Sequence, residues 1–301
     1  MSFKISNNTK GILNGAIAAA SYGTNPLFAL PLYAKGVGIN SVLFYRYFLA
    51  VIIYYLWLKF YKKISLKISK KEFFPLFILG LFFSFSSLTL FEAFKYIEPG
   101  IACTILFIYP VIVAIIMTIF FKEKITKTVI FAIISTSIGI ALLYRGESGV
   151  NLNFHGVCVV LLSALLYALY IVGVKNIKTI KDINSAKLSF YVMLFGLLVY
   201  IVNLKFCTEL QILHNPTSWL LVTGLSIFPT IISLETITVA IKLIGSTNTA
   251  ILGALEPLTA IFFGILFFNE QLTLRISIGV ILILLGVFLI ISSNKKKQEK
   301  A

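Results

Sequence analysis

The sequence predicts an all-α fold: a ten-transmembrane-helix bundle built from two inverted five-helix repeats. Composition is the first observation behind this prediction. Of the 301 residues, 59% are hydrophobic and 12% are charged, whereas soluble domains carry about 25% charged residues. The charges cluster between apolar runs of roughly 17–25 residues, a length that crosses a hydrocarbon core of about 30 Å. Little of the chain is left over for a soluble domain.

The second observation is an internal duplication. Residues 93–142 align without a gap to residues 240–289, at a constant shift of 147 residues. Shifts of 145 and 146 residues extend the match toward the N-terminus. The matched pairs include Tyr22 and Tyr167, Phe44-Tyr45 and Phe190-Tyr191, Pro110 and Pro257, Glu123 and Glu270, and Gly139 and Gly286. Duplicated apolar hairpins are typical of membrane transporters.

Ten apolar spans can be placed along the chain, joined by short loops. They cover residues 11–34, 41–58, 73–94, 99–121, 128–144, 155–174, 188–204, 219–241, 245–268 and 275–292. The first is read as a retained helix and not as a cleaved signal peptide, because its apolar run continues past the small residues. Five spans per repeat is an odd number, so residues 151–301, which end in a basic tail, must enter the membrane inverted relative to residues 1–150. Inverted halves can exchange conformations, which is the physical basis of alternating access.

The distribution of positive charge predicts an orientation. If the N-terminus is cytoplasmic, 20 of the 26 Lys and Arg residues lie on the cytoplasmic side, five lie outside and Arg46 lies within a span. This bias follows the positive-inside rule and predicts a multi-pass protein of the cytoplasmic (inner) membrane with both termini cytoplasmic. The bias also accounts for the net charge of +15, so no nucleic-acid partner is expected.

Several residues of the second half form a recognisable pattern: a helix start rich in small residues, Glu256-Pro257 in mid-span, Glu270 in the following turn and a last helix with glycine. Arg46-Tyr47 opens the second span. With these features the whole chain resembles the EamA-type transporters of the drug/metabolite transporter superfamily, where Phe usually follows the Arg. The resemblance implies ten helices, a central cavity between the halves, and export of amino acids or other small organic metabolites and drugs.

Ionisable side chains within the spans are candidate functional residues, because each costs about 2.5–3.5 kcal/mol at a helix centre. They are Arg46, Glu92, Glu235 and Glu256. Arg46 and Glu92 fall near the predicted outer surface, where they could form a structural ion pair or an outer gate that breaks during transport. Lys95, three residues after Glu92, is a competing partner. For Glu235 a structural role is favoured.

Glu256 is the principal candidate for the substrate cavity. Pro257 beside it removes a backbone hydrogen bond, and small residues share its helical face, which allows a cavity wall or a close helix contact. A protonated Glu256 that only holds the bundle together is the alternative. The other expected cavity residues are Tyr22, Asn25, Tyr109, Tyr167 and Tyr170. Tyr109 is the repeat counterpart of Glu256, and Asn25 belongs to a polar stripe that must face protein or water.

Motifs of catalysis and nucleotide hydrolysis (HExxH, GxSxG and GxxxxGK[ST]) are missing from the sequence, and its three cysteines lack the spacing of a zinc site. No enzymatic activity, cofactor or metal is therefore expected. The sequence predicts a secondary transporter of a small-molecule substrate, with protons as the candidate coupling ion and a homo-oligomer left open. The alternative is a lipid or lipid-linked sugar translocator. An intramembrane enzyme is disfavoured because the carboxylates fall at different depths.

Overall fold

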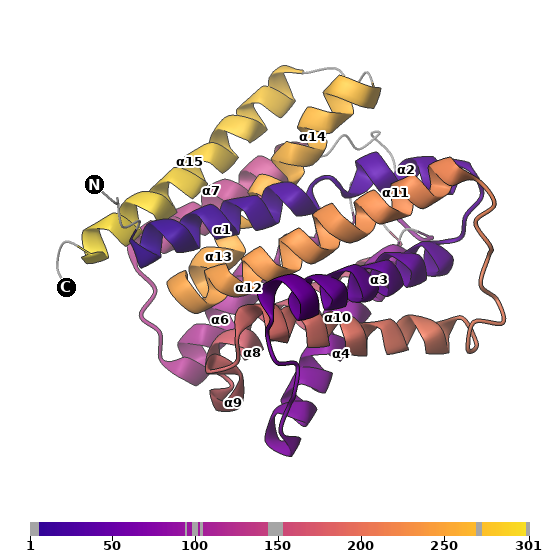
Figure 1. The fold of residues 1–301 in the computed structure, drawn as a ribbon. Coiled ribbons are helices and arrows are strands. Elements are labelled where there is room, and N and C mark those ends of the chain that lie inside the picture. The colour runs from indigo at the N-terminus through magenta and orange to yellow at the C-terminus, as the bar shows by residue number, and fades with distance from the viewer. Residues whose placement is uncertain are drawn as a thin grey trace, which may run out of the picture.

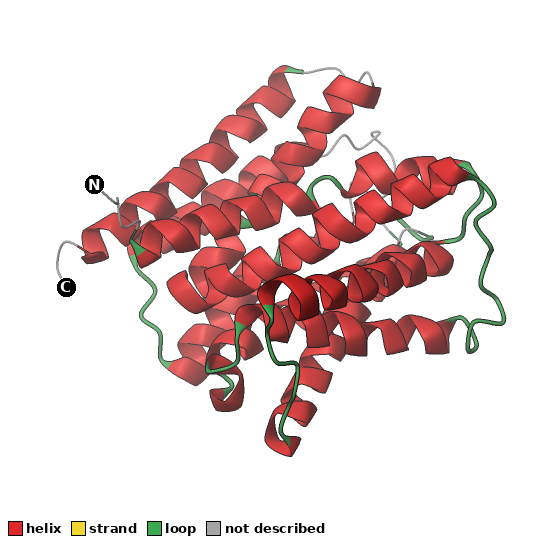
Figure 2. Cartoon of the chain, in the orientation of Figure 1, coloured by secondary structure: helices red, strands yellow, loops and turns green. Residues whose placement is uncertain are grey.

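The computed structural model describes residues 6–93, 95–97, 102, 105–143, 153–268 and 273–298. Within these ranges the chain forms helices and loops and no strand (Figure 2), which confirms the all-α prediction for the described residues. Glu270, expected in a turn, lies outside them.

The helices of the two repeats run back and forth along one bundle (Figure 1). Those of the first repeat are α1 (Asn7–Tyr22), α2 (Asn25–Ala34), α3 (Ile39–Leu56) with its π-helical end η1 (Trp57–Lys62), α4 (Lys70–Ala93), α6 (Tyr109–Phe121) and α7 (Lys127–Leu143). Those of the second repeat are α8 (Phe154–Asn176), α9 (Lys178–Lys181), α10 (Ser185–Asn203), α11 (Pro216–Ser226), the π-helical η2 (Ile227–Ile232), α12 (Ser233–Ile244), α13 (Ser246–Leu252), α14 (Leu255–Phe268) and α15 (Leu274–Gln298). The start of α1 and the end of α15 lie at the same end of the bundle (Figure 1).

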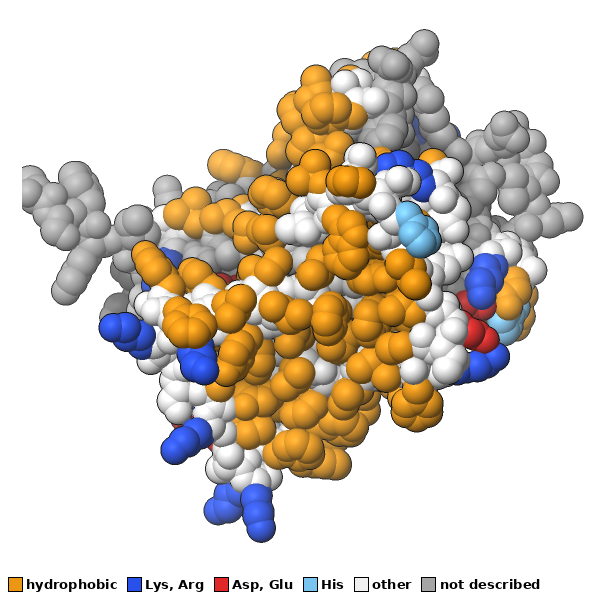
Figure 3. Space-filling model, turned by 45° about the vertical axis from the view of Figure 1, so that its right-hand side comes forward, with side chains coloured by type: hydrophobic (Ala, Val, Ile, Leu, Met, Phe, Trp, Pro, Cys, Tyr) orange, Lys and Arg blue, Asp and Glu red, His pale blue; other side chains and the backbone are white. Residues whose placement is uncertain are grey.

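Among the residues that the structure describes, six helices are long and apolar enough to cross a membrane. They are Ile39–Lys62, Lys70–Ala93, Phe154–Asn176, Ser185–Asn203, Pro216–Ile244 and Ser246–Phe267, and Tyr109–Phe121, Lys127–Leu142 and Leu274–Leu289 are shorter apolar helices. Hydrophobic side chains cover the middle of the face shown in Figure 3, and charged side chains gather on either side of it. These features fit a multi-pass membrane protein, whereas the count of ten spans stays a prediction.

Helices of the two repeats pack against each other in pairs. α1 lies on α12, α4 on α8, α3 on α10 and α7 on α15. The last pair approaches closely at Gly139 and Gly286, which the duplication matches. A Cβ on Gly139 would lie 2.8 Å from the carbonyl oxygen of Gly279, and one on Gly286 would lie 2.9 Å from that of Ala132. Small residues that let membrane helices approach in this way are typical of their interfaces.

Candidate functional site

Helix breaks at three places position the site. The first predicted span, residues 11–34, divides into α1 and α2 at Gly23–Thr24, and the ninth, residues 245–268, divides into α13 and α14 at Gly253–Ala254. A turn at Phe107–Ile108 precedes α6. Prolines in the first turn of each following helix are Pro26, Pro110 and Pro257. Proline lacks the N–H that would continue the preceding helix but suits a helix start, so its position explains why the chain breaks there.

A small cavity lies where these breaks meet. Its lining residues are Gly15, Ala18, Ala19, Tyr22, Tyr109, Tyr167, Ser233, Ile237, Thr249, Gly253 and Glu256. The volume of about 10 Å³ is roughly the room that one water molecule needs. The helices are therefore closed around the site in this conformation.

Glu256 lies in the first turn of α14, just past a break and not in the middle of a continuous helix as expected. The N–H groups at a helix start favour a negative charge there. The carboxyl group forms no hydrogen bond or ion pair with any residue that the structure describes, and Arg46 lies beside Tyr22, which lines the same cavity. Opposite it, Gly23 approaches so closely that a Cβ would lie 2.5 Å from the Glu256 carbonyl oxygen. The α1–α2 break thus packs on the α13–α14 break.

Tyr109, the repeat counterpart of Glu256, begins α6. Its hydroxyl donates to the carbonyl oxygen of Ala250 in α13 at 3.1 Å, and a Cβ on Gly253 would overlap that hydroxyl. The rings of Tyr109 and Tyr167 meet edge to face, with centroids 4.8 Å apart. Residues of both repeats therefore close the cavity together.

Two predicted cavity residues lie outside this lining. Tyr170 stacks behind Tyr167, with ring centroids 6.3 Å apart, and its hydroxyl lies 3.3 Å from that of Thr238. Asn25 lies beyond the α1–α2 break and accepts a hydrogen bond from Arg46 at 3.2 Å. The structure therefore brings together Tyr22, Tyr109, Tyr167 and Glu256, and it places Tyr170 and Asn25 behind them.

Arg46 is a buried charge held by neutral oxygens. It is 1% exposed, and besides Asn25 it donates to the Thr230 hydroxyl at 2.6 Å and to the Pro229 carbonyl at 2.9 Å. The Thr230 hydroxyl in turn donates to the Leu225 carbonyl at 2.9 Å, which lacks its usual helical donor because residue 229 is proline. Arg46 thus ties α3 to α2 and to the π-helical segment η2. Its guanidinium also lies 5.5 Å from the Tyr22 ring centre, next to the cavity.

Arg46 and Glu92, which from the sequence could form an ion pair or an outer gate, are not paired with each other in this conformation. Glu92, at the end of α4, forms an ion pair with Lys95 at 2.7 Å, and the two side chains are 43% and 58% exposed. Both residues line a separate pocket of about 230 Å³ at that end of the bundle. Arg46 points instead toward α2 and η2, because depth along a span does not fix the face that a side chain occupies.

Comparison with known proteins identifies the family. A profile of the EamA-like transporter family matches residues 9–145 and again residues 154–292. The chain belongs to this family. Such a match over nearly the whole chain makes the protein a membrane transporter and confirms the resemblance drawn from Arg46, Glu256 and their neighbours.

Two curated relatives are similar to this EamA-like transporter. An uncharacterized transporter of Clostridium kluyveri is 26% identical over 184 residues, which is 59% of this chain and 58% of the relative. An uncharacterized transporter of Bacillus subtilis, YxxF, is 23% identical over 240 residues, 77% of this chain and 74% of its own. A solved crystal structure described only as a protein superposes with a TM-score of 0.79 over 94% of this chain and 96% of its own, at 15% identity. That likeness shows the fold alone.

Some polar residues of the transporter's site were not predicted from the sequence. Ser233 donates to the Ala18 carbonyl at 3.0 Å, and Thr249 lines the cavity, yet Ser and Thr are too common in membrane helices to stand out. Pro229 is the sequence signal in this part of the eighth span, because a proline within a span is expected to bend it and frees a carbonyl. Glu235 does not belong to the cavity lining.

Proposed function

We propose that this EamA-like transporter is a secondary active transporter of the cytoplasmic membrane, and that it exports amino acids or other small organic molecules by alternating access. The observation that carries the proposal is Glu256, a carboxyl group that forms no ion pair with any described residue and lies in a closed cavity between broken helices of both repeats. An ionisable group inside a membrane marks a substrate or ion pathway by default. Discontinuous helices at mid-membrane are the usual ligand sites of secondary transporters.

The small size of the cavity bears on the mechanism. At about 10 Å³ it does not hold an organic solute, so the substrate binds when the repeats have moved apart. Tyr22 and Tyr109 come from the first repeat, and Tyr167 and Glu256 come from the second. Rocking of one repeat against the other therefore widens the site toward one face at a time. Glu256 then offers a carboxylate to a proton or to a cationic group, and the tyrosines offer hydroxyls and aromatic faces.

The orientation in this proposal follows the lysine bias, with both termini cytoplasmic. We therefore call the end of the bundle that carries the start of α1 and the end of α15 the inner end, and the opposite end the outer end.

Flux through the purified protein in proteoliposomes tests the proposal. A panel of labelled amino acids and small metabolites is offered with and without an imposed pH gradient. We expect flux of one chemical class, and we expect the gradient to increase its rate. Flux that ignores the gradient would contradict proton coupling. No flux of any solute through folded protein would contradict solute transport and favour the lipid-translocator alternative.

A further inference from the structure

α3 and α10, which form the second predicted span of each repeat, pack antiparallel. Tyr47 near the start of α3 and Tyr200 near the end of α10 have ring centroids 4.8 Å apart, and Tyr55 near the end of α3 lies 6.1 Å from Phe190 near the start of α10. A non-helical segment follows each helix. We call residues 63–69 the inner strap and residues 204–215 the outer strap, after the ends of the bundle at which they lie.

The outer strap is tied to the start of α3 through Gln211. The Tyr45 hydroxyl donates to the Gln211 carbonyl at 3.1 Å, and the Gln211 N–H donates to the Ser41 hydroxyl at 3.1 Å. The Gln211 side chain also accepts from the Gly38 N–H. These bonds join a strap of the second repeat to a helix of the first.

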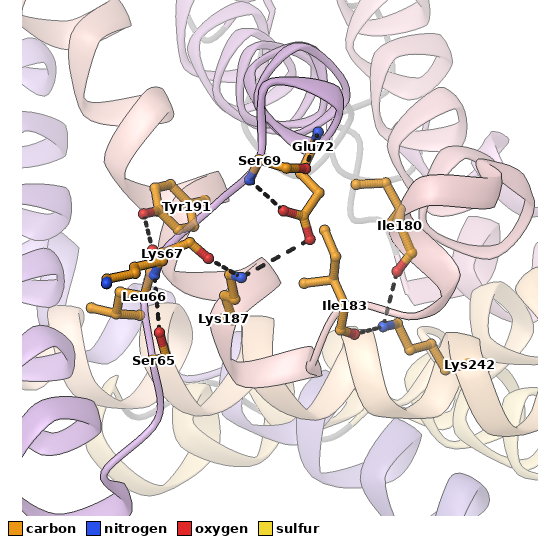
Figure 4. Close-up of polar contacts among 10 residues, drawn as sticks. All are labelled: Ser65, Leu66, Lys67, Ser69, Glu72, Ile180, Ile183, Lys187, Tyr191 and Lys242. Carbon is orange, nitrogen blue, oxygen red and sulfur yellow. Dashed lines mark hydrogen bonds and ion pairs between the residues drawn. The ribbon is translucent and has the colours of Figure 1, made fainter.

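The inner strap is tied to the start of α10 in the corresponding way (Figure 4). The Tyr191 hydroxyl donates to the Leu66 carbonyl at 2.5 Å. Lys187 donates to the Lys67 carbonyl, and its ammonium lies 4.0 Å from the Glu72 carboxylate at the start of α4. These bonds join a strap of the first repeat to a helix of the second.

The duplication relates the two ties. The shift of 146 residues that pairs Phe44-Tyr45 with Phe190-Tyr191 also takes Ser41 to Lys187. Tyr45 and Tyr191 each stand seventh in their helix, which begins at Ile39 in α3 and at Ser185 in α10. Each hydroxyl holds a backbone carbonyl of the opposite repeat's strap. Repeat symmetry has therefore placed the same tie at opposite ends of the bundle.

We propose that Tyr45 and Tyr191 are the two members of a matched pair of latches, and that release of one latch lets the transporter open to that face. The proposal rests on the proposed alternating access. Both latches are formed here, where the cavity is closed, and a state open to one face must separate the repeats at that face. The acceptors are strap carbonyls at the ends of the bundle, where water can replace the lost bond, so each latch breaks at a small net cost.

Each latch substitution should shift the populations of the outward-open and inward-open states in a defined direction. Tyr45→Phe removes the outer bond and keeps the ring, which packs on Trp219 with centroids 5.5 Å apart, so the outward-open state gains population. Because the states share one equilibrium, the inner end then closes more of the time. Tyr191→Phe acts in the opposite direction. One net hydrogen bond changes the ratio of the two states about two- to tenfold.

Amide hydrogen exchange of the full chain in lipid nanodiscs, followed by mass spectrometry without substrate, tests the latches. Tyr45→Phe should speed exchange in the outer strap and slow it in the inner strap, and Tyr191→Phe should do the reverse. In the double variant, the ratio of the exchange rates of the two straps should return to its wild-type value. Tyr61→Phe, a substitution at a 76% exposed ring at the end of η1, is the matched control and should change neither strap.

Slower exchange at the far end is the decisive result, because loss of a merely structural bond cannot protect a distant segment. Faster exchange confined to the mutated end, or at both ends in both variants, would overturn the latches. Since no substrate is needed, this result is independent of the flux assay. Flux without the reciprocal exchange pattern would overturn the latches and leave the transport proposal standing, whereas the reciprocal pattern without flux would support the latches.

Discussion

Glu256→Gln is expected to lower gradient-driven flux at least about tenfold without lowering the amount of folded protein in the membrane. Gln keeps the shape and hydrogen-bonding capacity of the side chain, but it can neither carry the charge nor exchange the proton. A tenfold loss corresponds to about 1.4 kcal/mol, a modest value for a carboxylate that binds the proton or a cationic group of the substrate. The measurement is the initial rate of flux in proteoliposomes, divided by the protein recovered as a single species.

Asp182→Asn is the matched control for this experiment. Asp182 is exposed at the end of α9, and a surface charge of this kind contributes little. Its substitution should leave the flux within about twofold of wild type. Unchanged flux in Glu256→Gln would remove Glu256 from the mechanism, and an equal loss in both variants would point to net charge and away from the cavity.

Arg46→Met is expected to lower both stability and flux. The substitution removes three hydrogen bonds from a charged donor and leaves Asn25 and the Pro229 carbonyl without that partner inside the bundle. Loss of such bonds destabilises a buried network by about 3 kcal/mol, and η2 loses its attachment to α3. The midpoint of thermal unfolding in detergent measures the loss of stability.

The exposed Arg275 provides the control for Arg46, because Arg275→Met makes the same chemical change on the surface of the bundle. It should leave the midpoint unchanged. Arg46→Lys should lie between wild type and Arg46→Met, since an ammonium cannot reach all three acceptors with the geometry of a guanidinium. An Arg46→Met variant as stable as wild type would mean that the neutral acceptors do not depend on Arg46.

The helical membrane fold could be predicted from the sequence because a chain in lipid must satisfy its backbone polar groups internally. The helix breaks were harder to see. Residues 11–34 and 245–268 read as continuous spans, since their apolar runs continue through Gly23 and Gly253. Pro26 and Pro257 were the local signals, and in the structure they stand just past the breaks.

The candidate site was predicted best where the duplication constrained it. Matching of Tyr109 with Glu256, and of Tyr22 with Tyr167, pointed to residues that share one cavity in the structure. The hydrogen-bond partners of Arg46 could not be predicted from the sequence, because Pro229 and Thr230 are separated from it by 183 and 184 residues along the chain. The sequence also left the pairing of Arg46 with Glu92 open, because a similar depth in the membrane does not place two side chains on facing sides of their helices.

Alternating access is tested most directly by measuring whether the central cavity can be reached from each side of the membrane. Ile237 lines the cavity and is 9% exposed, so Ile237→Cys, with the three native cysteines replaced by alanine, reports on this site without removing a polar group. A membrane-impermeant thiol reagent is added to one side of oriented proteoliposomes, and then to the other side in a separate sample. Alternating access predicts labelling from both sides. Labelling from one side alone, or from neither, would contradict it.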